Sequence, residues 1–134
     1  MAETHGYSGK PLWQKLGMKP GMRVCVLHPP AHYFSLIDGA EKIELTSSGP
    51  AELVHLFCKT RADLDGEVEG ALGEVASGGM LWVSWPKKSS DLFVDLTEGQ
   101  LREVILPTGW VDVKVCAVDA DWSGLKFLKR KAKA

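Results

Sequence analysis

Two histidines follow a short apolar segment near the start of the chain. His28 and His32 are four residues apart, and Pro29 and Pro30 lie between them. An i, i+4 pair of this kind suits metal binding or acid–base chemistry when the segment is helical. The two prolines argue against a regular helix, and no third ligand is evident. We therefore predict no metal site, and exposed loop histidines are the simpler interpretation.

A second group of chemically useful residues ends a later apolar run. Trp85 is followed by Pro86, Lys87 and Lys88, and Ser84 precedes it. An indole beside two ammonium groups could stack on a flat ligand and pair with an anion. The alternative is a tryptophan that packs against a helix, next to two exposed lysines. Ser84 lacks the Gly-x-Ser-x-Gly pattern, which argues against a serine hydrolase.

The three cysteines each lie inside an apolar, strand-like run. Cys25, Cys58 and Cys116 are widely spaced, so reduced core thiols are expected rather than disulfides or a metal site. Cys58 is nearest to a strand end, and a catalytic role is the less favoured alternative. His55 lies in the middle of a predicted strand and is interpreted as a hydrogen-bonded core histidine.

Composition indicates one ordinary globular domain over residues 1–134. The chain is 45% hydrophobic and 25% charged, and its formal net charge is −1. This balance gives no general attraction to nucleic acid or to an anionic membrane. No apolar run is long enough to span a membrane and no signal-peptide pattern is present, so a cytoplasmic location is expected. The basic end, residues 125–134, is interpreted as a last strand and a solubilising tail.

Strand-like and helix-like segments alternate along the chain after an N-terminal arm of residues 1–22 that contains a short helix. Thr60 with Asp63, and Thr97 with Gln100, have the spacing of a capping box at a helix start. Such alternation predicts parallel strands joined by helical crossovers. Strands are expected at 23–27, 42–46, 52–58, 80–85, 111–118 and 125–129, and helices at 12–16, 33–37, from 60 to a Gly78-Gly79 stop, and from 97 to Pro107.

The predicted fold is a three-layer α/β sandwich with a mostly parallel sheet of about six strands and a C-terminal antiparallel hairpin. Ligands of such sheets bind beyond the carboxyl ends of the strands. We expect a ligand site at this rim, with Trp122 in the hairpin turn beside it. The candidate ligand-binding residues are His28, Pro29, His32, Ser84, Trp85, Lys87, Lys88 and Trp122.

This order of elements resembles the class I methyltransferase fold, and the segment Ser77–Val83 resembles the late "Gly-Gly, strand" segment of those enzymes. More closely, the chain resembles a family of short uncharacterised proteins over nearly its full length. The matching segments are Tyr7–Leu12, Lys19–Val24, Gly79–Lys88, Leu106–Gly109, Val111–Asp119 and Trp122–Lys126. That family carries no assigned chemistry, so the resemblance implies a Rossmann-type, methyltransferase-like scaffold and little about activity.

The sequence departs from the methyltransferase pattern where the cofactor would bind. Backbone N–H groups of a glycine-rich loop normally approach the ligand, but Pro29 and Pro30 occupy this loop and have no N–H. The acidic residue expected at the end of the second strand is replaced by the run Thr46–Ser48.

These departures lead to a ranked set of functions. The first is a non-catalytic or regulatory binding module that needs no cofactor and binds an anionic small molecule or a protein partner. The alternative is an atypical S-adenosylmethionine-dependent methyltransferase. A homodimer that buries a sheet edge or a tryptophan face is a third option. Neither a membrane nor a nucleic acid is expected as partner, and the ligand's identity is not specified by the sequence.

Overall fold

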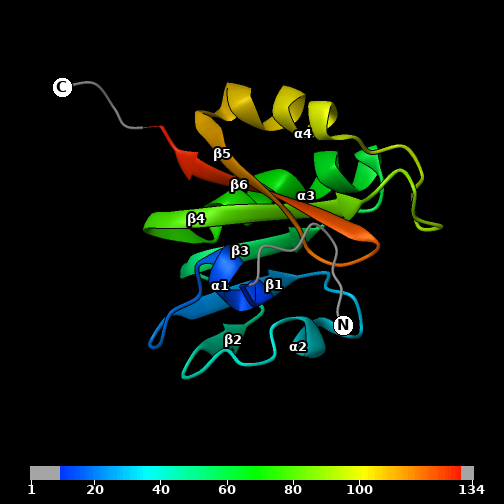
Figure 1. Cartoon of the computed structure of the whole chain (residues 1–134). Helices are drawn as coiled ribbons and strands as arrows, with labels where there is room; N and C mark the ends of the chain where they lie inside the picture. The colour runs from blue at the N-terminus through cyan, green and yellow to red at the C-terminus, as the bar shows by residue number, and fades with distance from the viewer. Residues whose placement is uncertain (1–9, 131–134) are drawn as a thin grey trace.

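The computed structural model describes residues 10–130 and contains one six-stranded sheet (Figure 1). Its order is β2-β1-β3-β4-β6-β5, and the first four strands are parallel. β6 runs antiparallel to both of its neighbours. The strands are β1 (Arg23–Leu27), β2 (Glu44–Thr46), β3 (Ala51–Phe57), β4 (Val75–Pro86), β5 (Trp110–Ala117) and β6 (Trp122–Lys129).

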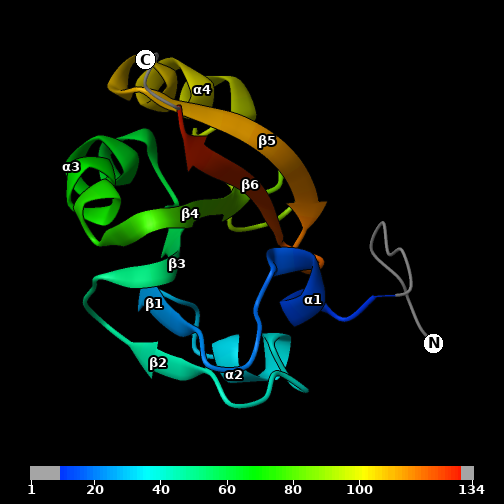
Figure 2. The same cartoon turned by 90° about the vertical axis from the view of Figure 1, so that its left-hand side faces the viewer.

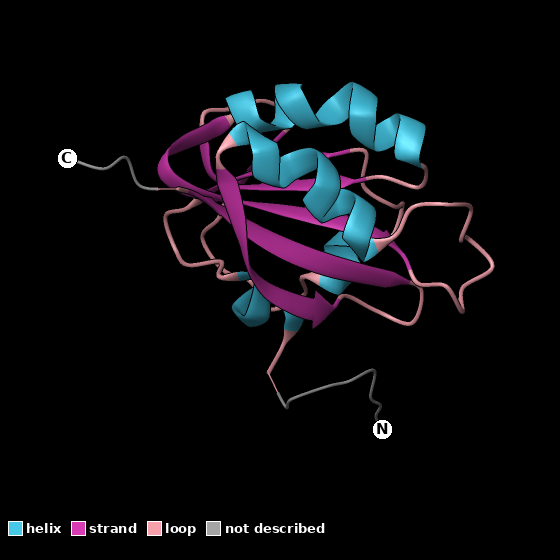
Figure 3. Ribbon diagram, turned by 90° about the horizontal axis from the view of Figure 1, so that it is seen from above, coloured by secondary structure: helices cyan, strands magenta, loops and turns pink. Residues whose placement is uncertain are grey.

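Helices cover both faces of the sheet, as the sequence predicted. The helices are α1 (Leu12–Leu16), α2 (Tyr33–Leu36), α3 (Arg61–Gly73) and α4 (Glu98–Ile105), and a 3-10 turn follows α4 at Leu106–Thr108. The two longer helices, α3 and α4, lie side by side over one face (Figure 3). The short α1 and α2 lie on the other side (Figure 2). The three-layer arrangement with an antiparallel C-terminal hairpin is therefore confirmed.

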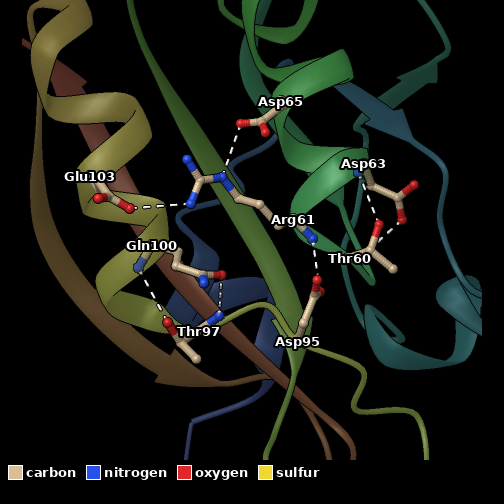
Figure 4. A network of polar contacts seen from close by, with 8 residues as sticks. All are labelled: Thr60, Arg61, Asp63, Asp65, Asp95, Thr97, Gln100 and Glu103. Atoms are coloured by element: carbon tan, nitrogen blue, oxygen red, sulfur yellow. Dashed lines mark hydrogen bonds and ion pairs between the residues drawn. The ribbon is translucent and has the colours of Figure 1, made fainter.

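The starts of the two longer helices form as their sequences predict. The Thr60 hydroxyl accepts from the Asp63 N–H and the Asp63 carboxylate accepts from the Thr60 N–H; Thr97 and Gln100 repeat this pattern (Figure 4). Each box satisfies N–H groups that the first helical turn leaves without partners.

Arg61 fixes the start of α3 relative to the rest of the helical layer. Its backbone N–H donates to Asp95, in the loop that precedes α4, and its guanidinium contacts Asp65 and Glu103 (Figure 4). Glu103 lies on α4, so the contact joins the two helices. The α3 start therefore has a fixed position at the rim of the sheet, where β3 ends.

Two predicted boundaries are wrong. The helix after Thr60 ends at Gly73, and the segment from Val75 through Gly78-Gly79 belongs to β4 instead of ending a helix. A glycine pair is typical of a helix end, but Gly78 and Gly79 lie inside β4, after the helix has already ended. The last strand begins at Trp122 instead of Leu125, so Trp122 is a strand residue and not part of the hairpin turn.

Candidate functional site

The carboxyl ends of β1 and β3 meet at a point where the chain changes direction across the sheet. After β1 the chain adds β2 on one side, and it then returns to place β3 on the other side. Open α/β sheets bind ligands at such switch points. A cavity of about 470 Å³ lies at this point, between the loop after β1, the start of α3 and the start of β6. We call it the rim cavity; its lining residues are His28, Pro29, Pro30, Ala31, His32, Phe57, Lys59, Asp63, Glu67, Leu92, Asp121 and Trp122.

Two histidine–carboxylate pairs hold the loop after β1 at its two ends. His28 Nε2 lies 3.1 Å from Glu67 Oε1 on α3, and His28 has a left-handed backbone with φ of 55°. His32 Nε2 lies 2.9 Å from Asp119 Oδ2 in the turn between β5 and β6. The prolines between the histidines form one wall of the rim cavity, so the two pairs set the position of that wall.

Asp119 is the more firmly held of the two carboxylates. Its Oδ1 accepts backbone N–H bonds from Asp121 and Trp122, both 2.8 Å long, which leaves Oδ2 for His32. Burial opposes ionisation, but the hydrogen bond from His32 and those from the two backbone N–H groups outweigh it, and the net effect lowers the pKa of Asp119. Asp119 is thus an anionic partner that orients the His32 ring at the cavity.

The rim cavity combines an aromatic floor with carboxylates. The Phe57 and Trp122 rings meet edge to face, with centroids 5.0 Å apart, and both side chains are almost fully buried. Asp63, Glu67 and Asp121 lie among the lining residues, with Lys59 as the one lysine. A flat or apolar group with a positive charge would suit these surroundings.

A second, mainly apolar cavity of about 430 Å³ adjoins the first. It shares the wall of Pro29, Pro30 and Ala31 with the rim cavity, so the proline loop separates the two. Its other lining residues come from β1, α2 and the end of β2: Val26, Tyr33, Phe34, Leu45, Thr46 and Ser47. We call it the apolar cavity.

A buried polar chain lies under the site, on the α1/α2 face of the sheet. The Tyr33 hydroxyl is 3.0 Å from His55 Nδ1, and His55 Nε2 is 2.7 Å from Ser84 Oγ. Burial lowers the pKa of His55 to about 3, so its ring is neutral, and burial raises the pKa of Tyr33. His55 is therefore the hydrogen-bonded core histidine that the sequence predicted.

The structure brings four of the eight predicted ligand residues together. His28, Pro29, His32 and Trp122 line the rim cavity. Ser84 is fully buried and bonded to His55, and Trp85 is 6% exposed and packs in the apolar core under α3 and α4. Lys87 and Lys88 line neither of the two cavities. The helix-packed interpretation of Trp85 is the right one, and ligand binding by the four cavity residues stays a prediction.

Cys58 lies at the end of β3, but its thiol is buried and protonated, which does not suit a nucleophile. Its side chain is 1% exposed. Burial, and after it the charges of Asp63 and Glu67, raise the pKa of the thiol to about 12, which keeps it protonated at neutral pH. Cys25 and Cys116 are also buried free thiols, as expected.

The sequence analysis missed the carboxylates of the site. Asp63 and Glu67 are one turn apart on α3, and Asp119 and Asp121 lie in the turn that precedes β6. Asp63 was recognised only as a capping residue. The i, i+4 spacing of Asp63 and Glu67 at the start of a helix that follows a central strand was the available signal, because this start must face the rim.

Two further classes of site are not found in the described part of the chain. Residues 10–130 contain no group of three or more His, Cys, Asp or Glu side chains arranged to hold a metal ion. Within the same residues, no helix is both long and apolar enough to cross a bilayer.

The fold is that of methyltransferase structures. A SAM-dependent methyltransferase from Aquifex aeolicus superposes with a TM-score of 0.59 at 13% identity, covering 87% of this chain and 86% of its own. The ribosomal protein L11 methylase from Lactobacillus delbrueckii gives 0.56 at 11% identity, with 88% and 74% covered. An O-methyltransferase from Planctomyces limnophilus gives 0.60 at 13% identity, and this chain spans 54% of its length.

Comparisons by sequence give no such relatives. No protein-family model matches the chain, and no curated protein matches it. Because the sequence identities to the solved structures are so low, the similarity concerns the fold alone. The resemblance to the methyltransferase fold is thereby confirmed at the level of architecture.

Proposed function

We propose that this chain binds S-adenosylmethionine across the two adjoining cavities and acts as an atypical methyltransferase. The observation that carries the proposal is the reversed strand β6, placed between β4 and β5 in a sheet whose switch point holds the cavities. The methyltransferase structures above share this fold, so the methyltransferase alternative has more support than the non-catalytic binding module.

The residues that line the two cavities suit a nucleoside with a positive charge, but they lack the glycine-rich loop that usually binds one. The apolar cavity between the ends of β1 and β2 has room for a flat base, and Thr46 and Ser47 supply hydroxyls at its edge. The carboxylates of the rim cavity favour a positive charge on the other side of the proline wall. Pro29 and Pro30 cannot donate backbone N–H bonds, so side chains must replace the glycine-rich cradle.

Different residues of the chain would bind the cofactor, exclude water and accept a proton. Bound S-adenosylmethionine supplies a methyl group on a sulfonium centre. Glu67 and Asp121 favour the cationic end, and the buried floor of Phe57 and Trp122 excludes water. His32 lines the cavity and its Nε2 bonds to Asp119, so we assign its Nδ1 the role of accepting a proton from the methyl acceptor.

Calorimetric titration with S-adenosylmethionine and with S-adenosylhomocysteine tests the proposal. Ala31 is exposed and lines both cavities, so Ala31→Trp fills the space without disturbing the core. We expect this variant to weaken binding by about tenfold or more, roughly 1.4 kcal/mol. Ala62→Trp, exposed on α3 and outside both cavities, is the matched control and should bind normally.

The competing function is a binding module without methyl transfer. The proline-occupied loop is the observation that favours it, because the backbone donors of a cofactor cradle are missing at Pro29 and Pro30. If neither S-adenosyl compound binds to the unmodified chain, the methyltransferase proposal is wrong and the binding module is the better account.

A further inference from the structure

Two lysines on neighbouring strands lie directly opposite each other, away from both cavities. Lys114 on β5 and Lys126 on β6 are cross-strand partners. Lys126 is also the partner of Trp82, whose indole N–H donates to the Leu16 carbonyl at the end of α1, and the Lys114 ammonium donates to the Lys15 carbonyl at 3.3 Å. Side chains of cross-strand partners share a face, so both lysines lie on the α1 side of the sheet.

The charged groups that act on Lys126 are other lysines. Burial, and after it the charges of Lys114 and Lys19, lower the pKa of the Lys126 ammonium. Within residues 10–130, none of these three side chains forms an ion pair with a carboxylate. Two other ammonium groups therefore act on that of Lys126, and no carboxylate from the described part of the chain neutralises any of the three.

This arrangement lowers the stability of the fold when nothing is bound. Like charges directly opposite each other on adjacent strands are destabilising, and opposite charges are the favourable choice at such a pair. The carbonyl of Lys15 offsets part of the cost for Lys114. Lys126 is only partly exposed, so water compensates its charge less well than it would on an open surface. A bound anion would attract each ammonium group and so offset the repulsion between them.

We propose that Lys19, Lys114 and Lys126 form a binding site for a phosphate-bearing small molecule on the face beneath α1. Three ammonium groups match the multiple negative charges of a phosphoryl or pyrophosphoryl group better than the single charge of a carboxylate. The patch is short, and the chain as a whole carries a formal charge of −1, which favours a small ligand over a nucleic acid. The site goes beyond methyl transfer and does not depend on it.

Titration of the ¹⁵N-labelled chain with pyrophosphate at low, constant ionic strength tests the site. Amide signals of Lys19, Lys114, Lys126 and their neighbours should shift together and saturate, while those of His28, His32 and Trp122 at the rim stay in place. Equivalent sodium sulfate and chloride series separate a specific oxyanion effect from screening.

Lys126→Met retains the apolar stem and removes the charge. We expect it to raise the melting temperature in the absence of pyrophosphate, because the repulsion disappears, and to weaken pyrophosphate binding by about tenfold or more. Lys114→Met should act in the same direction. Lys129→Met, an exposed lysine on the same strand opposite Trp110, is the control and should change neither quantity.

Several results would overturn the site. Pyrophosphate that shifts no signals near Lys126 up to saturating concentration excludes it, as does binding that survives both substitutions. A single-stranded oligonucleotide that binds more tightly than pyrophosphate at equal phosphate concentration would reassign the patch to nucleic acid. Loss of S-adenosylmethionine binding leaves this test unaffected, because none of the three lysines lines the rim cavity or the apolar cavity.

Discussion

The two faces of the sheet are packed in different ways. Under α3 and α4 the core is apolar throughout, with Leu64, Leu101, Trp85 and Phe127 among its buried members. Under α1 and α2 the buried residues include a polar chain of three side chains and an indole that donates to a helix carbonyl. The two longer helices on the apolar face begin in capping boxes, whereas α1 and α2 have no side-chain cap.

The apolar face therefore stabilises the fold, and the polar face is the one connected to the candidate site. The apolar face needs only shape and burial, and its stability should not depend on pH. The polar face is continuous with the loop that forms the cavity wall: Tyr33, which follows that loop directly, bonds to His55, and Phe57 on the same strand as His55 is part of the cavity floor. Changes in the polar chain should therefore reach the site, and changes under α3 and α4 should not.

The largest effect is expected from Leu64→Ala on the apolar face. Leu64 is fully buried on α3, so the substitution leaves a cavity and should lower the free energy of unfolding by about 2–5 kcal/mol. Urea unfolding followed by tryptophan fluorescence measures the loss, which should be equal at pH 7 and pH 5. Glu69→Ala, exposed on the same helix, should change stability by less than about 0.5 kcal/mol. A loss that varies with pH would contradict the comparison.

On the polar face, His55 makes stability depend on pH. Its pKa falls from 6.5 to about 3 in the folded chain, so the unfolded chain binds more protons between these values. The stabilisation is complete above pH 6.5 and is lost as the pH falls toward 3, at about 1.4 kcal/mol per pH unit.

His55→Gln removes this titration while retaining a donor and an acceptor. The variant should lose some stability at pH 7, and its stability should fall less steeply than that of the unmodified chain between pH 6.5 and pH 4.5. Unfolding curves at several pH values provide the measurement, and His28→Gln in the exposed loop is the control. Parallel slopes for His55→Gln and the unmodified chain would show that His55 is not the neutral buried group described.

Tyr33→Phe should have a smaller effect than the changes above. It removes the hydroxyl that bonds to His55 Nδ1 and leaves a buried nitrogen without a partner, at a cost of about 1–3 kcal/mol. Because Tyr33 also lines the apolar cavity, ligand binding there should weaken together with stability. Ser84→Ala removes the bond at the other side of His55 but lines neither cavity, so it should reduce stability and weaken ligand binding less than Tyr33→Phe does.

The sequence predicts the helical layer well because its signals are local. Apolar residues at helical spacing and two capping boxes define α3 and α4 without reference to the rest of the chain. The parallel direction of the first four strands and the closing antiparallel hairpin also follow from general rules for crossovers and short hairpins, whereas the strand order was not predicted. The end of α3 was placed too late because Val75 continues the apolar spacing of the helix, although it already belongs to β4.

The site was harder to predict because it depends on contacts across the chain. Ser84 and Trp85 are adjacent in sequence, but successive side chains of a strand point to opposite faces, so the two cannot share a site. His32 and Asp119 are far apart in sequence, and only the folded sheet brings them together. Pro29 and Pro30 indicate that this loop lacks backbone N–H donors, but they do not indicate which side chains replace them.

The smallest effect is expected at the surface of the helical layer, from Arg102→Ala. Arg102 on α4 contacts Glu98 and Asp112, and its hydrogen bond is the main reason that the pKa of Asp112 is lowered. All three side chains are partly exposed, so solvent screens the interaction, and the loss should be about 0.5 kcal/mol and smaller in high salt. Because the lowered pKa stabilises the fold only while Asp112 is ionised, the loss should also shrink as the pH falls through that pKa. Urea unfolding at two salt concentrations measures the effect; a loss that matches Tyr33→Phe would mean that surface charge, and not the buried polar chain, distinguishes the two faces.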